Sequence, residues 1–113
     1  MIPRPNFGSI IVVEDPFVSN FLRCVLQRRG YRVIPVDALE AVALMRAPSA
    51  EIGLVITNLP SAFAEFADRL PLLYLAALPD PEVTAAFPSN RVLSKPFHPN
   101  QLLACVESLL LPM

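Results

Sequence analysis

The chain has 113 residues, of which 54% are hydrophobic and 17% charged, which predicts one folded domain over 1–113 with its core at about 8–111. Nine basic and ten acidic side chains leave a net charge of −1, which argues against nucleic-acid binding driven by overall charge. Two cysteines and one histidine are too few for a disulfide scaffold or a four-ligand zinc site. No apolar run reaches the ~18 residues of a membrane span, so we expect a cytoplasmic protein without a membrane segment.

The first two predicted elements are a buried strand and a helix. Residues 9–13 form a short β-branched apolar run, typical of a strand that is covered on both faces. Asp15 suits the N-cap of a helix over 16–29, and Gly30 stands where a helix commonly ends. Five apolar residues of this helix repeat at helical spacing, which is typical of a helix with an apolar face: Phe17, Phe21, Leu22, Val25 and Leu26.

The second strand is expected over 31–36. Pro35 lies inside it, and because proline has no backbone N–H to donate, this strand should lie at an edge of the sheet. Asp37 and Glu40 resemble a capping box for a second helix, which stops before Pro48. The apolar residues that support this helix are Leu39, Val42, Ala43 and Met45.

Three further strands alternate with helical segments in the second half of the chain. The strands are expected over 54–57, 72–75 and 91–94, and the helices over 62–70, from Asp80 to before Pro88, and over 99–111. The residues of these helices expected to face inward are Phe63, Phe66, Ala67, Leu70, Val83, Ala86, Phe87, Leu102, Leu103, Val106, Leu109 and Leu110.

Five strands that alternate with helices predict an α/β fold, a doubly wound parallel sheet covered on both faces. With the strand of Pro35 at an edge, the strand order 2-1-3-4-5 of flavodoxin-like proteins fits. Such sheets bind ligands at the carboxyl ends of the strands, near the switch between strands one and three. This rule selects the residues that follow the strands: Glu14, Asp15, Asn58, Ala76 and Lys95.

Four segments, which together span nearly the whole chain, resemble the receiver domain of two-component response regulators. They are IIVVED at 10–15, GLVITNLP at 53–60, PLLYLA at 71–76 and VLSKPF at 92–97. The resemblance implies a receiver-like flavodoxin fold and signalling partners, namely a histidine kinase or an effector. It also implies that the last helix and strand five could form the contact of a homodimer, and the oligomeric state stays open.

A typical receiver holds Mg²⁺ with an acidic pair after strand one and accepts a phosphoryl group on an aspartate after strand three. A Ser or Thr after strand four and a Lys after strand five contact that group. By this resemblance, Glu14 and Asp15 match the acidic pair and Lys95 matches the lysine, and the Lys95–Pro96 peptide is expected to be cis.

Three positions depart from the receiver pattern: the phosphoacceptor position is Asn58, the hydroxyl position is Ala76, and the usually aromatic switch position is Val92. An amide is not an anionic oxygen nucleophile, so Asn58 cannot form an acyl phosphate. The amide also removes one of three negative charges, so affinity for Mg²⁺ at Glu14 and Asp15 should fall, and no cofactor is required. Lys95 then has to find its carboxylate partner in Asp15 or Glu14, or has none.

Asn58 and Ala76 are only 76 − 58 = 18 residues apart, which predicts shortened third and fourth helices. The expected function is that of a degenerate, non-enzymatic receiver that acts through protein contacts. Two alternatives stay open: a phospho-competent receiver that uses Asp15 or Glu14, and a small-ligand module in the same crevice. Outside the crevice, Cys24 and Cys105 are expected to be inert packing thiols, and His98 an exposed residue that starts the last helix. A solvated face is expected for Arg28, Arg29 and Arg32.

Overall fold

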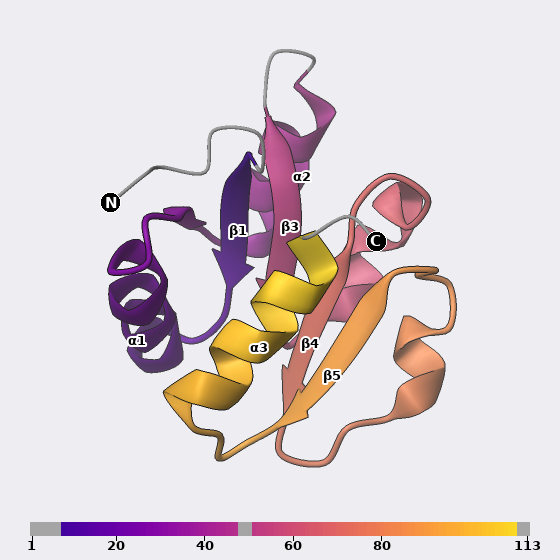
Figure 1. Ribbon diagram of the computed structural model, residues 1–113. Helices are drawn as coiled ribbons and strands as arrows, with labels where there is room; N and C mark the ends of the chain where they lie inside the picture. Colours follow the sequence, from indigo (N-terminus) through magenta and orange to yellow (C-terminus); the bar gives the residue numbers. More distant parts are fainter. Residues whose placement is uncertain (1–7, 48–50, 111–113) are drawn as a thin grey trace.

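The computed structural model describes residues 8–47 and 51–110, which form a five-stranded parallel sheet flanked by helical segments (Figure 1). The elements in chain order are β1 (Ser9–Val13), α1 (Pro16–Gln27), β2 (Arg32–Pro35), α2 (Ala38–Arg46), β3 (Ile52–Thr57), η1 (Pro60–Phe66), β4 (Leu72–Ala76), η2 (Pro81–Thr84), β5 (Asn90–Ser94) and α3 (Pro99–Leu110). The strand order β2-β1-β3-β4-β5 confirms the predicted flavodoxin-like topology. The predicted helix limits at Pro48 and Leu111 lie outside the described residues.

Two apolar cores lie on opposite faces of the sheet. The helices α1 and α3 cover one face, where Leu22, Leu26 and Leu102 pack on the strands, while α2, η1 and η2 cover the other. All five residues of β1 are buried, as expected for a strand with helices on both faces. Within the described part of the chain, no helix is long and apolar enough to cross a bilayer.

The predicted start of α1 is confirmed, and the helix ends at Gln27, two residues before the predicted limit at 29. Asp15 Oδ1 accepts hydrogen bonds from the backbone N–H groups of Phe17 and Val18, each at 3.0 Å. At the other end Gly30 takes a positive φ of 88°, which an L-residue with a Cβ adopts at a cost. The N–H groups of Gly30 and Tyr31 then reach back to the carbonyls of Gln27 and Leu26, the pattern of a Schellman motif.

The prediction for β2 is also confirmed at its main point. The strand pairs only with β1 and forms one edge of the sheet, and Pro35 lies at its exposed end opposite Val12. Asp37 Oδ1 accepts a hydrogen bond of 2.8 Å from Glu40 N, so Asp37 caps α2 as expected.

The apolar residues that repeat along α1 do not form one buried face, because Phe17 and Phe21 are 88% and 39% exposed. The buried stripe runs through Val18, Leu22 and Leu26, at intervals of four residues. Phe17 and Phe21 precede members of this stripe by one residue, or about 100° around the helix, and form a second stripe beside it.

Two shorter helices also expose some of their apolar residues. In α2 the buried pair is Ala41 and Met45, and Leu39, which lies about 200° from Ala41 around the helix, is 87% exposed, while Ala43 is exposed too. After β4 the inward residues are Thr84 and Phe87, whereas Val83 and Ala86, which were predicted to face inward, are exposed. Thr84 ends the 3₁₀ turn of η2, and the chain keeps the same three-residue spacing after it, where Phe87 N donates to the Thr84 carbonyl at 3.0 Å, so these two side chains lie on one side.

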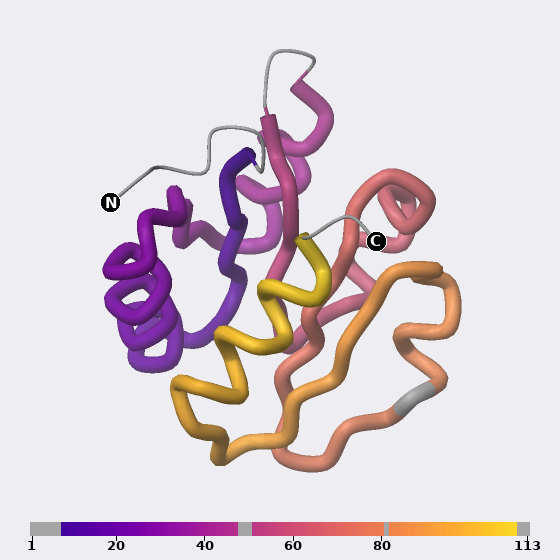
Figure 2. The backbone as a smooth tube through the Cα atoms, in the orientation of Figure 1, coloured from indigo at the N-terminus to yellow at the C-terminus, as the bar shows by residue number. Residues whose placement is uncertain are grey.

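The two predicted short segments are confirmed as reduced helices. Between β3 and β4 the chain forms only η1, a 3₁₀ segment kinked at Phe63, and between β4 and β5 only the single turn of η2. In Figure 2 the backbone makes a small coil between β3 and β4 and only a short bend between β4 and β5. Phe63, Phe66 and Phe87 are nonetheless at most 2% exposed, so the short segments still cover this core.

Candidate functional site

The carboxyl ends of the five strands lie along one side of the sheet, called the carboxyl edge below, and this edge brings the predicted crevice residues together. Val13 is in register with Thr57 on the neighbouring strand, so Glu14 and Asn58 each follow a paired strand end about 4.8 Å apart in the sheet. Ala76 and Ser94 are in register on β4 and β5, and the backbone N–H of Lys95 donates to the Ala76 carbonyl at 2.9 Å. The switch in strand order lies between β1 and β3, where such folds bind ligands.

Lys95 and Glu14 form an ion pair across this edge. Lys95 Nζ lies 2.9 Å from Glu14 Oε2, and the side chain of Glu14 is fully buried while that of Lys95 is 27% exposed. Oε2 has no aligned hydrogen bond among the described residues, so its contact with Nζ is electrostatic, whereas Oε1 accepts from Asp15 N at 3.1 Å. The expectation that the only lysine pairs with an acid of the doublet is confirmed for Glu14.

Asp15, the second residue of the acidic pair Glu14–Asp15, has a different role. Asp15 is exposed, and its Oδ1 holds two backbone N–H groups at the start of α1. The two neighbouring carboxylates therefore serve different groups: Glu14 neutralises a lysine inside the protein, and Asp15 caps a helix.

These residues do not fit a divalent cation. Mg²⁺ needs oxygen ligands in octahedral geometry and commonly takes one or two carboxylates, but the ammonium of Lys95 already holds the Glu14 carboxylate. The 58 position offers an uncharged amide. Among the described residues there is no group of three or more His, Cys, Asp or Glu side chains that could hold a metal ion.

Of the remaining residues of the receiver pattern, Asn58 and Ala76 lie at the carboxyl ends of β3 and β4, and Val92 lies in the middle of β5. Asn58 is half-buried directly after β3, where Thr57 Oγ1 accepts a hydrogen bond of 2.9 Å from Leu59 N and turns the chain. Ala76 is half-buried, and Val92, opposite Tyr74 in the ladder, is 38% exposed. The peptide bond between Lys95 and Pro96 is cis, as expected.

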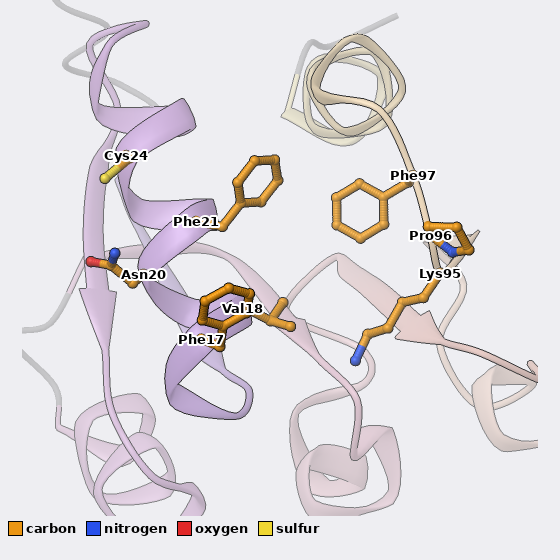
Figure 3. Close-up of a pocket in the computed structure, with 8 residues that line it drawn as sticks. All are labelled: Phe17, Val18, Asn20, Phe21, Cys24, Lys95, Pro96 and Phe97. Atoms are coloured by element: carbon orange, nitrogen blue, oxygen red, sulfur yellow. The ribbon is translucent and has the colours of Figure 1, made fainter.

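An open apolar groove beside Lys95 was not predicted. Figure 3 shows the rings of Phe21, on α1, and Phe97, after β5, turned toward one another, with Phe17, Val18 and Pro96 nearby. The two ring centroids are 6.1 Å apart, and the cavity has a volume of about 510 Å³. The second stripe of α1, Phe17–Phe21–Cys24 at spacings of four and three, is the sequence signal that could have revealed it.

The other residues outside the crevice divide between surface and core. His98 is exposed just before α3, and its backbone N–H donates to Gln101 Oε1 at 2.8 Å, which agrees with a surface residue that begins the helix. The arginines at 28, 29 and 32 are exposed as expected. Cys24 is exposed and lines the groove, so the expectation that it packs inside is wrong, whereas Cys105 is half-buried and burial raises its thiol pKa.

Solved structures share the fold of this chain. The signal receiver domain of an HD domain-containing protein from Pseudomonas fluorescens Pf-5 is 23% identical with a TM-score of 0.74, over 92% of this chain and 88% of that one. A two-component response regulator from Clostridium difficile is 15% identical with a TM-score of 0.73, over 90% and 95% of the two chains. The signal receiver domain of a signal transduction histidine kinase from Syntrophus aciditrophicus is 23% identical with a TM-score of 0.69, over 91% and 89%.

No family model and no curated protein matches the chain in sequence. The structural likenesses therefore establish the architecture: the chain has the fold of response-regulator receiver domains.

Proposed function

We propose that this chain is a degenerate receiver domain that signals through protein contacts in a two-component pathway, with a histidine kinase or an effector as its partner. One observation carries the proposal: Asn58 follows β3 beside Glu14, at the position where a receiver needs a carboxylate. The amide nitrogen lone pair is delocalised into the carbonyl, and the group carries no charge, so it cannot attack a phosphoryl donor to give an acyl phosphate.

The neighbouring positions support the same conclusion. Ala76 has no hydroxyl to donate to a phosphoryl oxygen, and Val92 has no ring that could change between exposed and buried rotamers. The positive charge of Lys95 is held by Glu14. Acceptor, hydroxyl contact and switch ring are absent together, which favours signalling by a surface of fixed shape.

The alternative that Asp15 or Glu14 accepts the phosphoryl group fits the geometry less well. The Glu14 side chain is fully buried and ion-paired, and Asp15 Oδ1 already accepts two backbone N–H groups. Either carboxylate would have to give up these contacts before it could attack.

Intact-mass measurement after incubation with acetyl phosphate and Mg²⁺ tests the proposal. We expect no phosphoryl adduct on the natural chain, and a phospho-competent receiver treated in parallel shows that the donor is active. A stable adduct that disappears in Asp15→Asn or in Glu14→Gln would contradict the proposal and identify the acceptor.

A further inference from the structure

Exposed apolar side chains gather at the carboxyl edge of the sheet. Among the described residues, the large apolar side chains that are more than half exposed are Phe17 at 88%, Leu39 at 87%, Leu59 at 51% and Leu78 at 91%. They follow β1, β2, β3 and β4 in turn, each within four residues of a strand end. Four separate connections therefore each present an apolar side chain where a strand ends, at the carboxyl edge of the sheet, which the arrowheads of β4 and β5 mark at the bottom of Figure 1.

Phe97 completes this series after β5. It is half-buried and forms one wall of the groove of about 510 Å³, with Phe21 as the opposite wall. This volume is within the range of sites that hold a large side chain or a small molecule. We call the four exposed residues and this groove the apolar edge.

The charges at the apolar edge are nearly all negative. In the segments from each strand end through the first turn that follows, five carboxylates are exposed: Asp15, Asp37, Glu40, Asp80 and Glu82. The one lysine in these segments is Lys95, which is paired with the buried Glu14. None of the five exposed carboxylates has a basic partner among the described residues.

From this combination we infer that the apolar edge docks a basic amphipathic helix of a partner protein. The apolar face of such a helix would cover the exposed phenylalanine and leucine side chains, and its Lys or Arg residues would lie against the carboxylates. The edge is about 19 Å across five strands, which a helix of about 13 residues spans. The inference rests on the proposed function and names the chemistry of its partner.

A second copy of this chain fits the edge poorly. An isologous dimer would bring the five carboxylates against their own copies, which repel. In a head-to-tail contact the edge would meet the opposite end of the molecule, where Arg28, Arg29 and Arg32 are exposed. No large apolar side chain in the described part of that end is more than half exposed. That end therefore offers positive charges but no apolar side chains to pack against the apolar edge. Anionic lipid surfaces are disfavoured by the same carboxylates.

The test uses the full chain and two synthetic 14-residue peptides (a length of about four helical turns). One has leucines on one helical face and lysines on the other, and the second has glutamates in place of the lysines. In fluorescence anisotropy we expect saturable binding of the leucine–lysine peptide, weaker at higher salt, and no binding of the leucine–glutamate peptide.

Variants locate the contact. Phe17→Ser combined with Leu78→Ser should raise the Kd about tenfold or more, the loss typical of anchor residues. Asp37→Asn combined with Asp80→Asn should also raise the Kd, because asparagine keeps both helix caps but removes two charges. Asp68→Asn, which removes an exposed charge at the other end of the sheet, is the matched control and should leave the Kd unchanged.

Equal binding of the two peptides, or a Kd that the edge variants leave unchanged, would overturn the inference. So would self-association, or binding to phosphatidylcholine vesicles, that Phe17→Ser and Leu78→Ser abolish, because the edge would then have another occupant. The acetyl phosphate experiment is independent of these peptides, so a failure here is distinguishable from a failure of the proposed function.

Discussion

Lys95 Nζ lies 2.9 Å from Glu14 Oε2, although β5 and β1, which these residues follow, are separated in the sheet by β3 and β4. The pair therefore ties the last connection of the chain to the first one across the mouth of the crevice. Because the Glu14 side chain is fully buried, its charge depends on Lys95 for compensation.

Removing the lysine charge should destabilise the protein. We expect Lys95→Met to lower the free energy of unfolding by about 3 kcal/mol, because it leaves an unpaired buried carboxylate. The double variant Glu14→Leu/Lys95→Met should recover most of that loss, since apolar residues can replace a buried ion pair. Urea denaturation measures both.

The exposed pair between Arg46 and Glu65, with Nη2 and Oε1 2.6 Å apart, is the matched control. Arg46→Met should change the urea midpoint little, because solvent screens this pair. Equal losses for Lys95→Met and Arg46→Met would mean that the Glu14 contact has no special role in stability.

The second prediction contrasts two phenylalanines. Phe63 is fully buried under the sheet, so Phe63→Ala should lower the free energy of unfolding by about 3 to 5 kcal/mol. Phe17 is 88% exposed, so Phe17→Ala should change it by less than about 0.5 kcal/mol. A large loss of stability for Phe17→Ala in urea denaturation would show that the first turn of α1 packs inward after all.

The order of the strands could be predicted because several local signals agree. Pro35 assigns its strand to an edge, Asp15 and Gly30 delimit the first helix, and the alternation of strands with helices requires parallel pairing. The Lys95 contact could also be anticipated, since an amide at Asn58 leaves the doublet as the nearby source of negative charge.

Which face of each helix is buried was harder to predict. In α1 two apolar stripes lie side by side, and hydropathy alone does not distinguish the stripe of Leu22 from that of Phe21. In the shortened segment before β5, the helix is a 3₁₀ turn with 3.0 instead of 3.6 residues per turn. Thr84 is therefore buried there, and Val83, which was predicted to face inward, is exposed. The first effect explains why periodicity did not reveal Phe17 and Phe21 at the apolar edge, and Leu59 and Leu78 lie in connections outside the helices, where periodicity carries no signal.

The third prediction concerns Asn58→Asp. A carboxylate at this position adds a negative charge beside Glu14 and competes for Lys95, so the crevice should gain affinity for Mg²⁺. We expect Mg²⁺ to raise the melting temperature of Asn58→Asp and not that of the natural chain. Asn58→Ala is the matched control without charge.

If Mg²⁺ stabilises the natural chain and Asn58→Ala as much as Asn58→Asp, the site holds a cation without residue 58. Because Ala76 and Val92 remain, metal binding should return more readily than any phosphorylation-dependent change of shape. A full conformational response of Asn58→Asp to acetyl phosphate, seen in amide chemical shifts, would show that these two positions are dispensable.

The fourth prediction separates the two thiols. Cys24 is exposed at the groove, while Cys105 is half-buried on α3 and its pKa is raised by burial, which the charge of Arg91 opposes. Since the thiolate is the reactive form, iodoacetamide should alkylate Cys24 first. Peptide mass mapping at short times follows the order, and earlier labelling of Cys105 would contradict the exposure of Cys24.

The fifth prediction follows from the raised pKa of Cys105. The folded protein keeps this thiol protonated to a higher pH than the unfolded chain does, so the unfolded state loses its proton first. The free energy of unfolding should therefore fall as pH rises from the ordinary pKa of a cysteine through the raised one. Urea denaturation at about pH 8 to 10 measures this slope. Other groups also titrate in this window, so the informative quantity is the difference in slope between two variants. Cys105→Ala should flatten the slope, while Cys24→Ala should retain it. Equal slopes for the two variants would mean that burial of Cys105 does not couple to stability.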